Sequence, residues 1–139
     1  MTWRVLVVDA DSKLRDAICA QLRRRGVRAA AVGDADAALR VLAAEPVDIL
    51  ITEACLPRRS GLWLLEEVHR RWAGRIPVVL LTGWYPASDQ LDAYRAADAV
   101  LIKPVRTDVL LTRIAWLLLE RRHPAPAPGA PRGRHAAGD

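Results

Sequence analysis

Four polar residues stand at the ends of short apolar segments of the sequence. They comprise two carboxylates, a hydroxyl and an ammonium: Asp9, Glu53, Thr82 and Lys103. Carboxylate oxygens are suitable ligands for hard divalent cations, and a buried ammonium needs a carboxylate to offset the loss of its hydration. If the fold brings the four side chains together, their chemistry is therefore electrostatic, as a cation site or as a buried ion pair.

The elements that would position these residues alternate between strand and helix. Short apolar, β-branched segments predict strands at 3–8, 28–32, 47–52, 77–81 and 99–102. Helical spacing, capping residues and stop signals predict the intervening helices at 12–25, from Asp34 or Asp36 to Pro46, at 62–72, from Ser88 or Asp89 to Ala97, and at 107–122. Residues 53–61 are expected to form a loop, because Pro and Gly interrupt them.

Five strands, each followed by a helix, predict an α/β domain with a doubly wound, five-stranded parallel sheet. We expect the flavodoxin-like (β/α)5 topology with the strand order 2-1-3-4-5. In open sheets of this kind, functional groups gather beyond the carboxyl ends of the strands. The four polar residues stand at such ends, so the predicted fold places them at one edge of the sheet.

Length and composition limit the classes of protein. The 139 residues fit one domain, expected at 1–122 and followed by a flexible, Pro/Ala/Arg-rich tail at 123–139. No apolar run approaches the ~20 residues of a membrane span, no signal peptide is recognisable, and a cytoplasmic location is expected. Cys19 and Cys55 lack metal-ligand spacing and predict two reduced thiols. The net charge of +5 comes mainly from Arg, and nucleic-acid binding is not favoured.

Four motifs relate the sequence to a known family: Val7-Val8-Asp9, Leu56-Pro57, Leu81-Thr82-Gly83 and Leu101-Ile102-Lys103-Pro104. In their order and spacing, the chain resembles the receiver domains of two-component response regulators over about residues 3–122. The resemblance implies that an acidic pair after the first strand and an acceptor Asp after the third hold Mg²⁺. It further implies that a hydroxyl residue and a Lys, here Thr82 and Lys103, contact the oxygens of a phosphoryl group.

The sequence departs from that pattern at two positions of the pocket. Ala10 occupies the second position of the acidic pair, and its methyl group cannot bind a metal. Glu53 occupies the acceptor position, where one extra methylene of about 1.5 Å displaces the carboxylate from in-line attack geometry. The chain is therefore predicted to be an atypical receiver, a pseudo-receiver, with weak or absent Mg²⁺ binding. Asp9 and Glu53 remain the only metal candidates, and Asp11 is better suited to cap the first helix.

Without metal or phosphate, the simplest partner for the Lys103 ammonium is the Glu53 carboxylate. This ion pair has two interpretations: Glu53 imitates a phosphorylated acceptor, or the pair merely fills a disused site. The second is favoured, because Glu carries one negative charge and a phosphate roughly two. The family's switch residue, usually aromatic, corresponds here to Val100, which has no ring to rotate. Coupling from the pocket through Thr82 is therefore expected to be weak or to follow another route.

The surface around the pocket offers candidate contacts for other proteins. Cys55 and Trp84 are expected at the pocket rim. The helix at 107–122 carries more apolar residues than the ~100° stripe that one core face needs. By resemblance, the face of the fourth helix, fifth strand and fifth helix, including Tyr94 and Trp116, is expected to bind a histidine kinase, another regulator or a second copy of the chain. A homodimer is one such outcome.

The leading hypothesis is a stand-alone, atypical receiver in phosphorelay signal transduction that acts by protein contact and is no enzyme. A second hypothesis is a receiver switch that accepts phosphate inefficiently, on Glu53 or elsewhere. A third is a flavodoxin-like domain that binds a small molecule, although the sequence has no glycine-rich phosphate loop. A fourth is nucleic-acid binding by the Arg-bearing tail.

Overall fold

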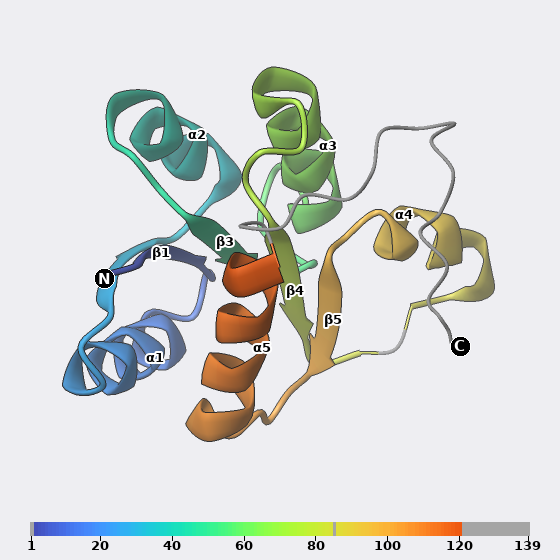
Figure 1. Cartoon of the computed structure of the whole chain (residues 1–139). Helices are drawn as coiled ribbons and strands as arrows, with labels where there is room; N and C mark the ends of the chain where they lie inside the picture. The colour runs from blue at the N-terminus through green and yellow to red at the C-terminus, as the bar shows by residue number, and fades with distance from the viewer. Residues whose placement is uncertain (1, 85, 121–139) are drawn as a thin grey trace, which may run out of the picture.

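The computed structural model describes residues 2–84 and 86–120, and these form one five-stranded parallel sheet with the order β2-β1-β3-β4-β5 (Figure 1). Its strands are β1 (Arg4–Val8), β2 (Arg28–Val32), β3 (Ile49–Thr52), β4 (Val78–Thr82) and β5 (Ala99–Ile102). The predicted doubly wound, flavodoxin-like topology and its strand order are therefore confirmed.

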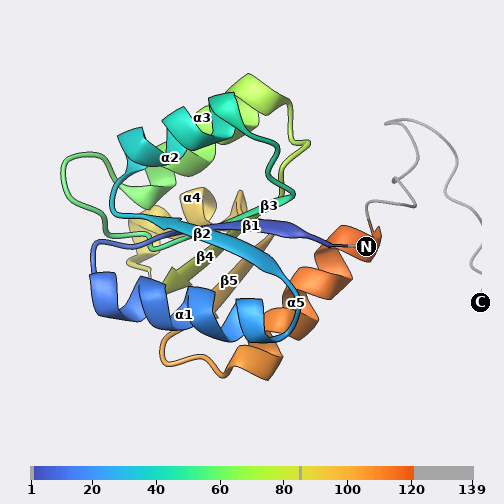
Figure 2. The ribbon, with the colours of Figure 1, turned by 90° about the vertical axis from the view of Figure 1, so that its left-hand side faces the viewer.

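Helices cover both faces of this sheet. They are α1 (Ser12–Arg24), α2 (Ala35–Ala44), α3 (Gly61–Trp72), α4 (Leu91–Arg95) and α5 (Thr107–Glu120). Figure 2 shows α1 and α5 below the sheet and α2 and α3 above it. Among the described residues no helix has the length and apolar composition needed to cross a membrane.

Alternation along the central strands divides the core into two layers. Val5 and Val7 pack with residues of α1 and α5, whereas Leu6 and Val8 pack with residues of α2 and α3. Successive side chains of a strand point to opposite faces, and helices lie on both faces, so the central strands are apolar without interruption. Burying one such side chain stabilises the fold by about 1.5–3 kcal/mol, and this rigid sheet is the frame for its carboxyl-end residues.

Helix caps follow the sequence signals closely. The Asp11 carboxylate accepts a hydrogen bond from the amide of Leu14, and Asp34, not Asp36, caps α2. Gly26 follows α1 with a φ of +82°, as expected for a left-handed position. Ser60 caps α3, which therefore begins at Gly61, one residue earlier than predicted.

Other boundaries differ from the prediction. The third strand begins at Ile49, two residues later than predicted. Asp48, just before it, makes two hydrogen bonds with Arg4: its carboxylate accepts from the Arg4 amide, and its own amide donates to the Arg4 carbonyl. The fourth helix is a 3-10 turn (Ser88–Gln90) followed by the five residues of α4, shorter than predicted, since its sequence buries only Tyr94. The predicted end of the fifth helix at 122 and the tail at 123–139 lie outside the described residues.

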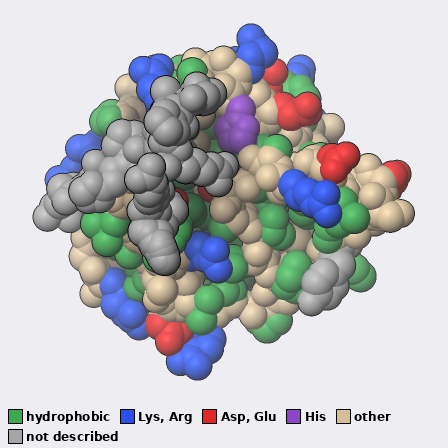
Figure 3. All heavy atoms as spheres, turned by 45° about the vertical axis from the view of Figure 1, so that its right-hand side comes forward, with side chains coloured by type: hydrophobic (Ala, Val, Ile, Leu, Met, Phe, Trp, Pro, Cys, Tyr) green, Lys and Arg blue, Asp and Glu red, His purple; other side chains and the backbone are tan. Residues whose placement is uncertain are grey.

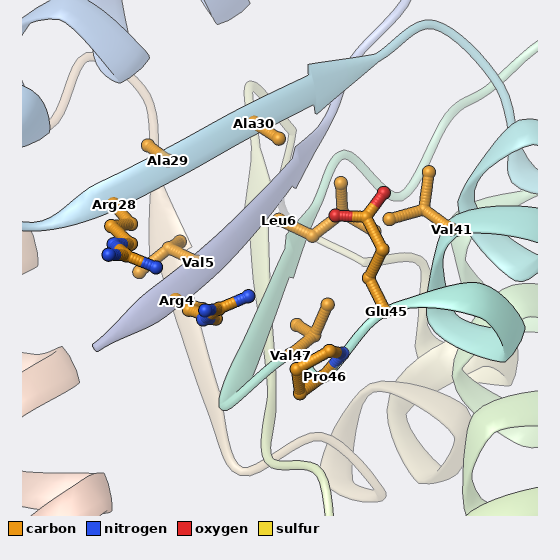
Figure 4. A pocket seen from close by; sticks show the side chains of 10 residues that line it. All are labelled: Arg4, Val5, Leu6, Arg28, Ala29, Ala30, Val41, Glu45, Pro46 and Val47. Atoms are coloured by element: carbon orange, nitrogen blue, oxygen red, sulfur yellow. The ribbon is translucent and has the colours of Figure 1, made fainter. Parts of the chain in front are cut away.

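A small cavity of about 150 Å³ opens at the opposite edge of the sheet, beyond the amino ends of β1 and β2 (Figure 4). Ala30 of β2 and Val41 of α2 line it, together with Arg4, Arg28 and Glu45. The cavity exists because β2 carries alanines, whose methyl groups do not fill the space below the end of α2. Space therefore remains unfilled between β2 and the end of α2.

Candidate functional site

The fold brings the four predicted residues together at the carboxyl edge of the sheet. Asp9 follows β1, Glu53 follows β3, Thr82 ends β4 and Lys103 follows β5. Three of them are buried, with exposed fractions of 5% for Asp9, 9% for Glu53 and 0% for Thr82. The expectation from strand-end placement is thus confirmed for the position of all four.

Lys103 lies between the two carboxylates. Its ammonium nitrogen, Nζ, donates a hydrogen bond of 2.7 Å to Glu53 Oε1 and a second of 2.7 Å to Asp9 Oδ2. The predicted pair with Glu53 is confirmed, and the equal contact with Asp9 was not predicted. One ammonium therefore bridges two carboxylates that would otherwise repel each other.

The remaining oxygen of each carboxylate accepts a hydrogen bond from the backbone. The Asp11 amide donates to Asp9 Oδ1 over 2.9 Å, and the Cys55 amide donates to Glu53 Oε2 over 3.1 Å. Every carboxylate oxygen of the pocket thus has a donor. Such matching is what buried charges require, since an unpartnered charge away from water is costly.

The ion pair stays charged at neutral pH. Burial favours the neutral form of Glu53, but hydrogen bonds from Lys103, the Cys55 amide and Thr82 outweigh it and hold the pKa of the carboxyl below its ordinary 4.5. Burial also opposes the charge on Lys103, yet Asp9 and Glu53 hold the pKa of its ammonium above its ordinary 10.5. The pocket is therefore electrostatically satisfied without a ligand.

Two residues that the sequence analysis did not single out shape the pocket loops. Arg15 of α1 donates hydrogen bonds from its guanidinium to the carbonyl oxygens of Asp9 and Ala10. Gly61 must lack a side chain, because a Cβ there would collide with the carbonyl oxygen of Glu53. The Gly61 amide also donates to the carbonyl of Ala54 over 2.8 Å. Motif spacing gives no signal for such long-range contacts.

The two residues expected at the pocket rim are exposed: Cys55 and Trp84, at 73%. Ala10, expected in the pocket, is also exposed. Both cysteines are free thiols. Val100 is 37% exposed on β5, so the switch-equivalent position presents an aliphatic side chain to the surface.

The expectation that Tyr94 contributes to a partner surface is wrong. Its side chain is only 6% exposed and belongs to the core layer beneath α2 and α3. The reason is the shortness of α4: Tyr94 is its sole buried residue, and the aromatic ring supplies the packing that a longer helix would spread over several positions. Trp116 of α5, by contrast, is 60% exposed.

Comparison with known proteins identifies the family. Residues 5–115 match the model of the response regulator receiver domain. The chain therefore belongs to the receiver domain family of response regulators.

Individual relatives agree with this assignment. The chain is 35% identical over 119 residues to the transcriptional activator protein PfeR of Pseudomonas aeruginosa, covering 80% of this chain and 38% of that protein. It is 34% identical over 133 residues to the two-component response regulator-like APRR5 of Arabidopsis thaliana, covering 90% of this chain and 23% of that protein. The chain thus spans less than two-fifths of the length of these relatives, and its stand-alone nature stays a prediction.

Solved structures share the fold. A receiver domain protein (CheY-like) from Methanospirillum hungatei JF-1 superposes with a TM-score of 0.82 at 27% identity, covering 88% of this chain and 98% of that one. The architecture that the motifs predicted is therefore the architecture of the family.

Proposed function

We propose that this receiver works in two-component signalling by protein contact, without phosphorylation and without Mg²⁺, because Lys103 permanently supplies the positive charge of its pocket. The observation that carries the proposal is the 2.7 Å contact of one ammonium with both Asp9 and Glu53. The domain is then a binding module and no enzyme, and its place of work is the cytoplasm, where two-component regulators receive their signals.

The pocket chemistry argues against phosphoryl transfer to Glu53. A nucleophilic carboxylate needs a free oxygen in line with the incoming phosphorus, but Oε1 of Glu53 is held by Lys103 and Oε2 by the Cys55 amide. Positioning is most of the catalysis in this reaction, and each of these contacts would have to break first.

The donor set also argues against Mg²⁺. This ion takes six oxygen ligands in near-octahedral geometry and gives up its water reluctantly. Within residues 2–84 and 86–120, no group of three or more His, Cys, Asp or Glu side chains is arranged to hold a metal. Asp9 and Glu53 are two carboxylates with a cation already between them, and Ala10 offers only a methyl group.

The partner surface that fits this function is the exposed apolar part of α4, β5 and α5. Figure 3 brings this side of the molecule forward and shows hydrophobic side chains in groups among basic and acidic ones. Five large apolar side chains of these elements are at least 37% exposed: Leu91, Val100, Val109, Trp116 and Leu119. Exposed apolar groups rimmed by charges are typical of protein contact sites, so a histidine kinase, another regulator or a second copy is the partner class.

Incubation with acetyl phosphate and Mg²⁺, followed by intact mass spectrometry, tests the proposal. We expect no stable gain of a phosphoryl group by the unaltered chain. The double variant A10D/E53D restores the acidic pair and the acceptor Asp, and we expect it to gain one group under the same conditions. Phosphorylation of the unaltered chain to the level of this variant would refute the proposal.

A further inference from the structure

Two arginines occupy neighbouring positions at the amino end of the sheet. Arg4 of β1 and Arg28 of β2 are partners in the register of these parallel strands. Side chains that are an even number of residues apart on a strand share a face. Arg4 therefore lies on the face of Leu6, and Arg28 on the face of Val32, which is the same face, packed with α2 and α3. Both arginines line the cavity beside the end of α2.

The two guanidinium groups have no acidic partner in the described part of the chain. The Asp48 carboxylate accepts a hydrogen bond from the backbone amide of Arg4 and not from its guanidinium. Glu45 also lines the cavity, and Figure 4 shows its carboxylate set apart from both arginines. Like charges at adjacent positions of neighbouring strands repel each other. An anion bound between Arg4 and Arg28 would offset this repulsion.

The size and lining of the cavity limit what such an anion can be. Apolar side chains form most of the remaining wall, namely Leu6, Ala30, Val41 and Val47. The volume of about 150 Å³ is that of an engineered protein cavity that binds benzene. A ligand that fills this space therefore combines an acidic group with an apolar body of about one ring.

The charges of the lining limit the ligand further. Two arginines and one glutamate give the wall a net charge of +1, two positive charges less one negative. A single negative charge balances this wall, whereas a phosphate monoester brings roughly two, and the second would face Glu45. The planar fork of a guanidinium also matches the two oxygens of a carboxylate. The acidic group that fits is therefore a carboxylate.

We propose that this cavity binds a small organic monocarboxylate, with its carboxylate between Arg4 and Arg28 and its apolar body against Ala30 and Val41. The site lies at the opposite edge of the sheet from Lys103 and its ion pairs. It is independent of the proposed function, since it needs neither phosphate nor metal. The domain would thereby respond to a small molecule as well as to a protein partner.

Titration of the isotope-labelled full chain with benzoate, followed by NMR, tests the site. We expect saturable shifts of the amides of Leu6, Ala30 and Val47. The expected dissociation constant is on the order of 1 mM, within the range that a ligand of about nine non-hydrogen atoms can reach. Benzyl alcohol has the ring without the charge, and acetate has the charge without the ring. Each should bind about tenfold more weakly than benzoate or worse.

Two variants separate the role of the charge from the role of the space. Arg28→Gln removes one guanidinium and should weaken benzoate binding by about tenfold. Arg24→Gln makes the same change at an exposed position of α1, on the other side of the sheet, and is the matched control that should leave binding unchanged. Ala30→Val places two methyl groups in the cavity and should abolish the saturable shifts.

Several results would overturn the proposal. One is the absence of saturable shifts with benzoate. Equal effects of Arg28→Gln and Arg24→Gln would show that the paired arginines do not hold the carboxylate. Unchanged binding by the Ala30→Val chain would place the ligand outside the cavity. Equal binding of benzoate and acetate would show that the charge of the surface alone attracts the anion.

Discussion

The two ends of the sheet differ in how their charged side chains are paired. At the carboxyl end, Lys103 contacts both Asp9 and Glu53, and the other carboxylate oxygens accept backbone amides. At the amino end, Arg4 and Arg28 line a cavity, and among the described residues neither guanidinium contacts a carboxylate (Figure 4). The charges of the carboxyl end are therefore paired with one another, whereas in the described part of the chain the two guanidinium groups of the amino end are not paired with carboxylates.

Burial explains the contrast. Unpartnered charges are costly away from water, so a pocket whose carboxylates are 5% and 9% exposed must match each of them. Arg28 is exposed and water can hydrate it. The stability of the folded chain is therefore enough to explain why Lys103 is paired with Asp9 and Glu53. The pairing does not by itself imply that the pocket is phosphorylated.

The largest effect should come from removing the bridging cation. Lys103→Met keeps the length and volume of the side chain but leaves two buried carboxylates facing each other without an ammonium. Breaking a buried charge pair from one side costs about 3–5 kcal/mol, and we expect a loss of that size in the free energy of unfolding, measured with urea at neutral pH.

The other lysine of the chain supplies the control. Lys13 is exposed on α1, and Lys13→Met should change the free energy of unfolding by less than about 0.5 kcal/mol. If Lys103→Met changes the free energy of unfolding as little as Lys13→Met does, the ion pairs of the pocket do not stabilise the fold. The contrast in charge pairing between the two ends of the sheet would then have no energetic consequence.

A smaller effect, and one with a defined pH range, is expected for Glu53→Gln. The folded state holds the pKa of Glu53 below its ordinary 4.5. The ionised carboxyl therefore contributes stability that is fully present above pH 4.5 and is lost as the pH falls through the lower, folded pKa. The difference in unfolding free energy between the two chains should be constant near neutrality and shrink below pH 4.5.

Urea unfolding over a series of pH values measures this difference. Glu66→Gln replaces an exposed carboxylate on α3 and is the matched control for the change of side chain. A Glu53→Gln difference that grows on acidification would show that burial, and not the hydrogen bonds from Lys103, Cys55 and Thr82, dominates the titration of Glu53.

The sequence predicted those features best that combine a local pattern with a rule of sheet topology. Apolar strands ending in polar residues predicted the sheet, and the rule that parallel strands end at one edge placed Asp9, Glu53, Thr82 and Lys103 together. The capping role of Asp11 was predicted for the same reason, since it depends only on the residues of the following turn.

The features that sequence reasoning missed depend on contacts between distant segments. The Arg15 guanidinium donates hydrogen bonds to the carbonyl oxygens of Asp9 and Ala10, and Gly61 lies against the Glu53 carbonyl. Neither contact has a spacing that could be recognised. Tyr94 was assigned to the surface by the family resemblance, which gives the face of the fourth helix, fifth strand and fifth helix as a partner surface. In a helix with a single buried position, the sequence pattern does not show which side chain faces the core.

The smallest effect is expected beside the cavity at the amino end of the sheet, and it has the opposite sign. Ala30→Val adds two methyl groups on the side of β2 that lines the cavity with Val41. Valine also suits a strand better than alanine, and filling such a space commonly gains about 0.5–2 kcal/mol. Because Ala30 is exposed and the cavity is open, we expect a gain at the low end of this range in urea unfolding.

Ala31→Val is the control that separates cavity filling from strand propensity. Ala31 points to the other face of β2 and packs against the core layer of α1 and α5, where added volume typically costs about 1–3 kcal/mol. If both variants gain equally, strand propensity alone is responsible and Ala30→Val fills no space in the cavity. A gain in stability for Ala30→Val with a loss for Ala31→Val would instead show that the unfilled space lies between β2 and α2. This space is at the opposite edge of the sheet from the ion pairs of Lys103 with Asp9 and Glu53.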